Sequence, residues 1–156
     1  MRPYSILFKK MAGGAAVIDT QDTWGIVCKE FPFELYGKAK ELPSQNWYDE
    51  HGVEEYTPPS LFMDAYDLKV EFAYKGAKFS ANVAIRSFLD YLTGNDGLNQ
   101  GAMLQVYDTY THIGRQKVRY LSVDNDMIVR NDGDGDVFTF TVNFRVNDPM
   151  TDIVLS

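Results

Sequence analysis

The chain has 156 residues, a length typical of one domain with its own hydrophobic core. Apolar residues make up 45% and charged residues 24%, as in folded soluble proteins, so a disordered chain is excluded. A formal net charge of −7 disfavours binding to nucleic acid or anionic membranes, and no run approaches the roughly 18 apolar residues of a membrane-spanning helix.

The first part of the chain predicts two strands and a long arm. Residues 5–9 and 24–33 read as strands joined through a glycine-rich loop, whose polar end at 19–22 favours a turn. Pro32 lacks a backbone donor and places the end of the second strand at a sheet edge or a bulge. Residues 37–60 contain prolines, acids and no sustained period, which predicts an ordered loop or an arm.

A strand and one helix follow the arm. Apolar and charged residues alternate through 67–74, as in a half-buried strand. Apolar residues then recur at helical spacing through 81–93, with Ser80 as the expected N-cap and Gly94 as the C-terminal stop. We therefore expect a single amphipathic helix packed against the strands.

Three more strands are predicted at 103–107, 116–123 and 137–146. The last alternates most strictly, with phenylalanine and valine on one face, so that face is expected to be a wall of the core. Turn-forming residues at 131–136 suit a wide hairpin. The predicted fold class is mainly β with one α-helix (α+β), a β-sandwich or split β-barrel, in a single domain over residues 1–156.

The Gly-Asp run at 132–136 resembles a calcium-binding loop, but the match is incomplete. If Asp132 were the first ligand, the sixth position would be Val137 instead of glycine. The twelfth position would be Asn143 instead of a bidentate glutamate. We favour a hairpin turn over a metal site, and expect Cys28, the only cysteine, to be a buried small hydrophobe.

No catalytic constellation is evident in the sequence. His51 and His112 lie in different polar segments without a partner at helical spacing, and no nucleophile elbow, Walker loop or dinucleotide fingerprint occurs. We predict no catalytic, cofactor-binding or metal-binding residues, hence a protein that is not an enzyme. A hydrolase with two carboxylates meeting in a cleft is the remaining catalytic alternative.

Two charge features suggest self-association. Acids and aromatic rings gather on the arm, and three basic residues alternate along one strand, so they are expected to share one face of it. Opposite patches can set the register of a head-to-tail contact between copies, although two solvated surfaces would explain the charges equally well. The hypothetical oligomer interface comprises Trp47, Tyr48, Asp49, Glu50, Glu54, Glu55, Tyr56, Arg115, Lys117 and Arg119.

The order of elements resembles the distal tail protein of long-tailed phages, especially its N-terminal ring-forming domain, and the related tail-tube fold. The segments that carry this resemblance are Trp24-Gly25-Ile26-Val27, the arm 42–52 (LPSQNWYDEHG), the strand 68–72 (LKVEF), the helix 85–92 (IRSFLDYL) and the closing strand 143–149 (NFRVNDP). The resemblance in the order of elements covers most of the chain.

The resemblance implies a structural component of a phage or prophage tail, located in the virion and assembled in the bacterial cytoplasm. It implies a hexameric ring around a central channel, with further copies and other tail or baseplate proteins as partners, joining the tail tube to the baseplate. An acidic subunit suits a channel for DNA, because like charges do not adhere. The alternative is a monomeric carbohydrate- or ligand-binding module that stacks sugars on Trp47, Tyr48, Tyr107 and Tyr110.

Overall fold

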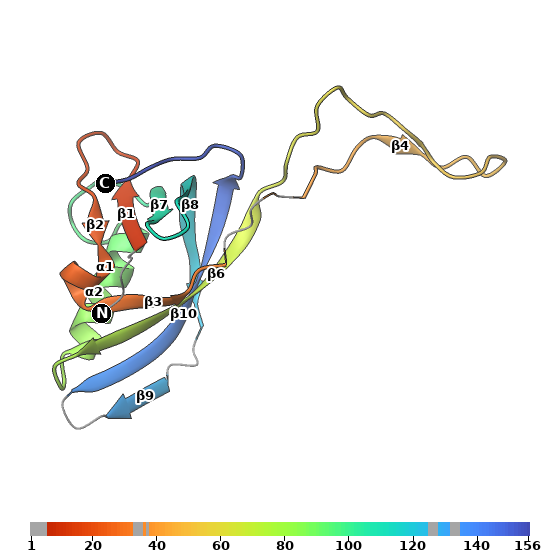
Figure 1. Ribbon diagram of the computed structural model, residues 1–156. Helices are drawn as coiled ribbons and strands as arrows, with labels where there is room; N and C mark the ends of the chain where they lie inside the picture. The colour runs from red at the N-terminus through yellow and green to blue at the C-terminus, as the bar shows by residue number, and fades with distance from the viewer. Residues whose placement is uncertain (1–5, 33–35, 37, 125–127, 132–134) are drawn as a thin grey trace.

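The computed structural model describes residues 6–32, 36, 38–124, 128–131 and 135–156 (Figure 1). The main sheet is antiparallel, with strand order β2-β1-β7-β8-β10-β6-β3, and β9 pairs with β10. Its strands are β1 (Ile6–Lys10), β2 (Ile18–Asp19), β3 (Ile26–Glu30), β6 (Tyr66–Gly76), β7 (Leu104–Asp108), β8 (Ile113–Val123), β9 (Ile128–Asn131) and β10 (Asp136–Asp148). The helices are α1 (Thr20–Trp24) and α2 (Ala81–Thr93), and β4 (Ser44–Gln45) pairs with β5 (Glu54–Glu55) in a separate small sheet.

The long pair β6 and β10 forms the centre of the sheet. Their register runs without a break from Tyr66 opposite Val146 to Gly76 opposite Asp136. Apolar side chains of both strands point to an inner face and polar ones to an outer face, as the alternation of the sequence predicts. The sheet curls strongly (Figure 1), so the predicted mainly β class is confirmed in its split-barrel form.

Helix α2 covers the inner face of the sheet over the range expected from the sequence. Its buried residues are Ala81, Ile85, Phe88, Tyr91 and Leu92. The ring of Phe88 lies 5.1 Å from that of Phe72 and 5.9 Å from that of Phe8, centroid to centroid, so one side chain joins the helix to two strands. Gly94 ends the helix in the left-handed conformation, whereas Ser80 occupies the N-cap without a side-chain capping bond.

The expectation of a single helix is wrong, because part of the predicted 24–33 strand and its preceding turn form a second one. In α1 the Asp19 carboxylate accepts a bond from the backbone N–H of Gln21 at 2.9 Å, and Gly25 ends the helix at φ 70°. The polar residues taken for a turn are therefore an N-cap and a first helical turn. Strand β3 begins only at Ile26, and its Cys28 is buried, as predicted, with its Sγ donating to the carbonyl of Glu30 at 3.3 Å.

The hairpin predicted at 131–136 lies partly outside the described residues. Strands β9 and β10, which flank it, are antiparallel, with Asn131 opposite Asp136. Strand β9 itself was not predicted. It pairs with residues 136–139 of β10, along the same edge of β10 that pairs with β8 over residues 142–148.

Candidate functional site

The arm between β3 and β6 leaves the body and extends away from it (Figure 1). Its root is closed by an isolated bridge between Ala39 and Met63, and the backbone N–H of Lys40 donates to the carbonyl of Phe62 at 2.7 Å. Farther out, β4 pairs with β5 in a two-residue ladder. The predicted arm is therefore a projecting two-stranded segment stiffened by its own backbone bonds.

The outer half of the arm exposes rings and carboxylates together. Every residue from 43 to 57 is exposed. The exposed fractions of Trp47, Tyr48 and Tyr56 are 49%, 101% and 65%. Trp47 Nε1 donates to the Glu54 carboxylate at 2.9 Å and ties the two strands together. Large rings held out in water without covering neighbours are typical of a contact surface.

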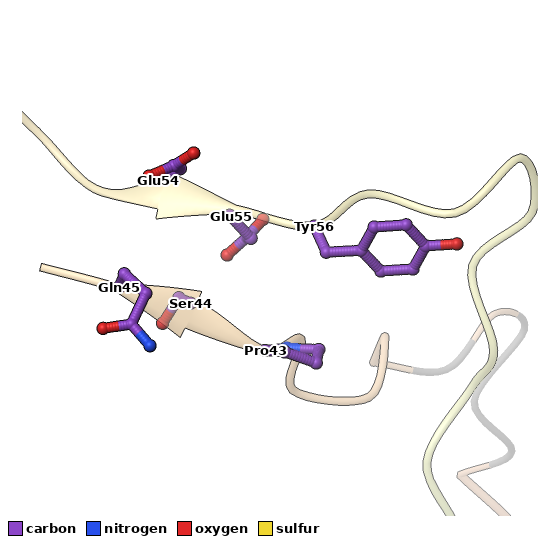
Figure 2. Close-up of a pocket in the computed structure, with 6 residues that line it drawn as sticks. All are labelled: Pro43, Ser44, Gln45, Glu54, Glu55 and Tyr56. Atoms are coloured by element: carbon purple, nitrogen blue, oxygen red, sulfur yellow. The ribbon is translucent and has the colours of Figure 1, made fainter.

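Figure 2 shows one face of this hairpin, where a shallow hollow of about 500 Å³ opens between its two strands. The residues that line it are Pro43, Ser44, Gln45, Glu54, Glu55 and Tyr56. The hollow is built from an exposed arm alone, so its walls offer two carboxylates and one ring to whatever lies against the arm.

The basic face predicted on β8 is only partly present. Arg115 is 3% exposed and lies opposite core residue Val106, whereas Lys117 and Arg119 are exposed. The physical reason is a β-bulge: the register between β7 and β8 shifts beside Lys117, whose φ is 54°. The extra residue breaks the alternation and leaves Arg115 buried. The prediction that Arg115 shares an exposed face with Lys117 and Arg119 is therefore wrong.

The buried Arg115 instead holds the C-terminal segment 149–156 against β8. Its guanidinium donates to the carbonyl of Gly114 at 2.9 Å and pairs with the Asp152 carboxylate. Ile153 packs so closely over Gly114 that a Cβ at residue 114 would lie 2.2 Å from its carbonyl oxygen. Leu155, in the same segment, is buried.

The outer face of the sheet carries three ion pairs. Lys29 binds Glu71 at 3.1 Å, Lys69 binds Asp124 at 3.2 Å, and Arg145 binds Asp67 at 3.0 Å. Hydrogen bonds from Asn143 and Lys69 hold the pKa of Asp124 below its usual value. Lys29, Lys69 and Arg145 are thus each paired with a carboxylate of the same molecule.

A second concave surface lies between α2 and β10, with a volume of about 480 Å³. Ile85, Leu89 and Phe138 give it an apolar floor, and Asn82, Arg86 and Asp90 line its rim. The sequence pattern assigned these apolar residues to the core, so it gave no signal for a groove.

The residues proposed for sugar stacking do not form one platform. Tyr107 is buried, and its hydroxyl lies 2.9 Å from His112 Nδ1, so its ring is unavailable for stacking. Tyr110 is exposed beside that turn, whereas Trp47 and Tyr48 belong to the arm. The two histidines also stay apart, with His51 on the arm.

A metal site requires several ligating side chains that lie close together. Within the described residues, no group of three or more His, Cys, Asp or Glu side chains could hold a metal ion. None of the helices described is long and apolar enough to cross a membrane.

The most perturbed titratable groups lie inside the body. Lys10 Nζ donates to the carbonyls of Tyr91 and Gly101, the latter at 2.6 Å, and sits 4.5 Å from the centre of the Tyr91 ring. Burial lowers the pKa of Lys10 and raises the pKa of Tyr91 to about 12. These contacts tie β1 to the C-terminal end of α2, so we assign this pair a structural role.

Together, a curled antiparallel sheet with helices on its inner face and an exposed arm define a strand-rich domain whose distinctive surface projects from its body. The fold is similar to that of SPP1 Dit (gp 19.1), described as a paradigm of the hub adsorption apparatus in phages infecting Gram-positive bacteria. The TM-score is 0.60 at 14% identity, over 95% of this chain and 51% of that chain. The expected resemblance to a distal tail protein is therefore confirmed in fold.

The chain spans about half the length of SPP1 Dit. No protein-family model matches the chain, and no curated protein matches it.

Proposed function

We propose that the chain is a structural, ring-forming component of a phage tail, located in the virion, where it joins the tail tube to the baseplate. The observation that carries the proposal is the arm, whose residues 43–57 are all exposed, projecting from a fold similar to that of SPP1 Dit. Its partners are further copies of itself and other tail or baseplate proteins.

The arm has the properties of a segment that completes its packing on a neighbour. A two-stranded hairpin without a core of its own is marginally stable in water. Trp47, Tyr48 and Tyr56 nevertheless hold large rings in solvent there, and such rings often dominate the energy of interfaces. An arm that meets a different surface of the next copy makes a head-to-tail contact, which yields a ring when the rotation closes.

The overall charge suits the same role. A formal charge of −7 on each copy would make a ring whose channel repels phosphates, so DNA could pass without adhering. This argument concerns passage of DNA, and it assigns no specific nucleic-acid contact to any residue.

The test compares the full chain with a variant in which residues 42–60 are replaced by a short Gly-Ser linker. The bridge between Ala39 and Met63 is retained, so the body should keep its fold and its circular dichroism spectrum. Light scattering after size-exclusion chromatography, with negative-stain microscopy, should detect rings of the full chain and monomers of the variant. A full chain that stays monomeric at every concentration, or a variant that still forms rings, would contradict the proposal.

A further inference from the structure

We infer that the arm of one copy docks on the outer sheet face of a second copy, with Lys117 and Arg119 as the cationic acceptor. This inference rests on the proposed self-assembly and specifies its contact. It replaces the three-residue basic face expected from the sequence, because Arg115 is buried.

The acceptor is identified by the ion pairs of the outer face. Lys29, Lys69 and Arg145 each have a carboxylate within 3.2 Å. Among the described residues, none of the carboxylates forms an ion pair with Lys117 or Arg119, although both side chains are exposed. Lys75 of β6 is also exposed without an ion pair to any described residue, but it lies at the end of β6 opposite the arm. Lys117 and Arg119 are two residues apart on one strand, so together they offer two cations to an external anion.

The strand register increases the positive charge at this point. Arg119 lies directly opposite Arg145 in the pairing of β8 with β10. Like charges in opposite positions repel, and the neighbouring Asp67 carboxylate already binds Arg145. A carboxylate supplied by another molecule would relieve this repulsion, which an uncharged partner could not do.

The complementary anions are at the far end of the arm. Asp49, Glu50, Glu54 and Glu55 are all exposed there. The arm rejoins the body at Tyr66, which is paired with Val146 of β10. Val146 is paired in turn with Val118, the residue between Lys117 and Arg119, so the acceptor lies near the root of the arm. Figure 1 shows the tip of the arm far from that root. The arm therefore reaches the acceptor of another copy and not its own.

The groove between α2 and β10 is the other surface that could receive the arm. Its Arg86 and Asp90 stand one helical turn apart on the same rim, so their opposite charges offset each other. The rim of the groove therefore presents no excess of positive charge to the acidic arm. Charge complementarity thus favours the outer face over the groove.

Charge reversal tests the inference. Lys117→Glu/Arg119→Glu should weaken self-association about 10-fold or more in sedimentation velocity at low salt, with less effect at high salt. Lys78→Glu/Arg86→Glu is the matched control, because it changes the net charge equally on exposed residues of the helix side. It should change the association by less than about 2-fold.

A charge swap then identifies the arm as the occupant. Glu50→Lys/Glu55→Lys in the arm should restore association when combined with the reversed acceptor in the same chain. Glu54 is left unchanged because it accepts the bond from Trp47. Restoration supports the contact.

Three results would overturn the inference: unchanged association of the reversed acceptor, equal weakening by the control, or no restoration by the swap. If the first or second result is obtained and rings are still lost when the arm is removed, the proposed function stands and only Lys117 and Arg119 are excluded as the acceptor. A full chain that never associates would instead refute the ring itself.

Discussion

Gly114 marks the place where the C-terminal segment crosses β8, and replacement by alanine measures how firmly that segment is held. The new Cβ would lie 2.2 Å from the carbonyl oxygen of Ile153 and 2.8 Å from its Cγ1 atom. The nearest atom belongs to the backbone, so no change of side-chain rotamer can relieve the contact. We expect the segment to move off the strand.

The cost follows from what the movement exposes. Leu155 is buried, and full exposure of a leucine side chain costs about 1.5–3 kcal/mol. Asp152 would leave the buried guanidinium of Arg115, and because that carboxylate is 78% exposed we add only about 1 kcal/mol. The free energy of unfolding should fall by about 3 kcal/mol, measured by urea denaturation.

The control is the same substitution in a chain that ends at Pro149. Without the crossing segment the alanine meets no backbone, so Gly114→Ala should change the free energy of unfolding by less than about 0.5 kcal/mol. A full chain that tolerates the alanine equally well would refute the reasoning, since the close approach of Ile153 would then have no energetic consequence.

Three further predictions concern the core, the buried tyrosine and the arm. Phe88→Ala should lower the free energy of unfolding by about 3–5 kcal/mol in urea, whereas Val83→Ala on the exposed side of α2 should change it by less than about 0.5 kcal/mol; similar losses would contradict the assigned core. Because burial raises the pKa of Tyr91 to about 12 while the unfolded chain ionises near 10.0, the folded state should lose about 1.4 kcal/mol per pH unit across that interval. The Tyr91→Phe variant should not show this alkaline loss when its free energy of unfolding is measured in urea at each pH. At neutral pH the substitution should lower the free energy of unfolding only slightly, since no hydrogen-bond partner is found for the buried hydroxyl within the described residues. A variant with the same alkaline loss as the unchanged chain would contradict the raised pKa of Tyr91. Trp47→Ala removes only an exposed contact with Glu54, so the melting temperature should stay within about 2 °C while ring formation weakens in light scattering; intact rings would exclude the indole from the interface.

Local patterns predicted the parts of the fold that obey a simple period. Strict alternation placed the strands corresponding to β6 and β10, and helical spacing with Gly94 gave the range of α2. These segments bury one regular face, so their sequences must repeat with the period of the element. The arm was equally visible, because its prolines and acids interrupt both periods.

The remaining features depend on contacts between distant segments or on single irregular residues. The bulge at Lys117 inserts one residue into a strand whose basic residues are regularly spaced at every second position, so the sequence could not separate Arg115 from Lys117 and Arg119. Helix α1 has five residues, too few to show a helical period. The groove exists only because β10 passes beside α2, which no local pattern encodes.

The pairing of β10 has a consequence for how the domain forms. This strand contacts β6, β8 and β9, yet it follows all of them in the chain. Its pairing with β6 joins residues far apart in sequence, from Gly76 opposite Asp136 to Tyr66 opposite Val146. Such pairings form slowly, because much of the loop entropy is lost before any contact is gained. Until β10 arrives, β6 and β8 have open edges and an uncovered apolar face, so nascent chains would be exposed to aggregation and would benefit from a chaperone.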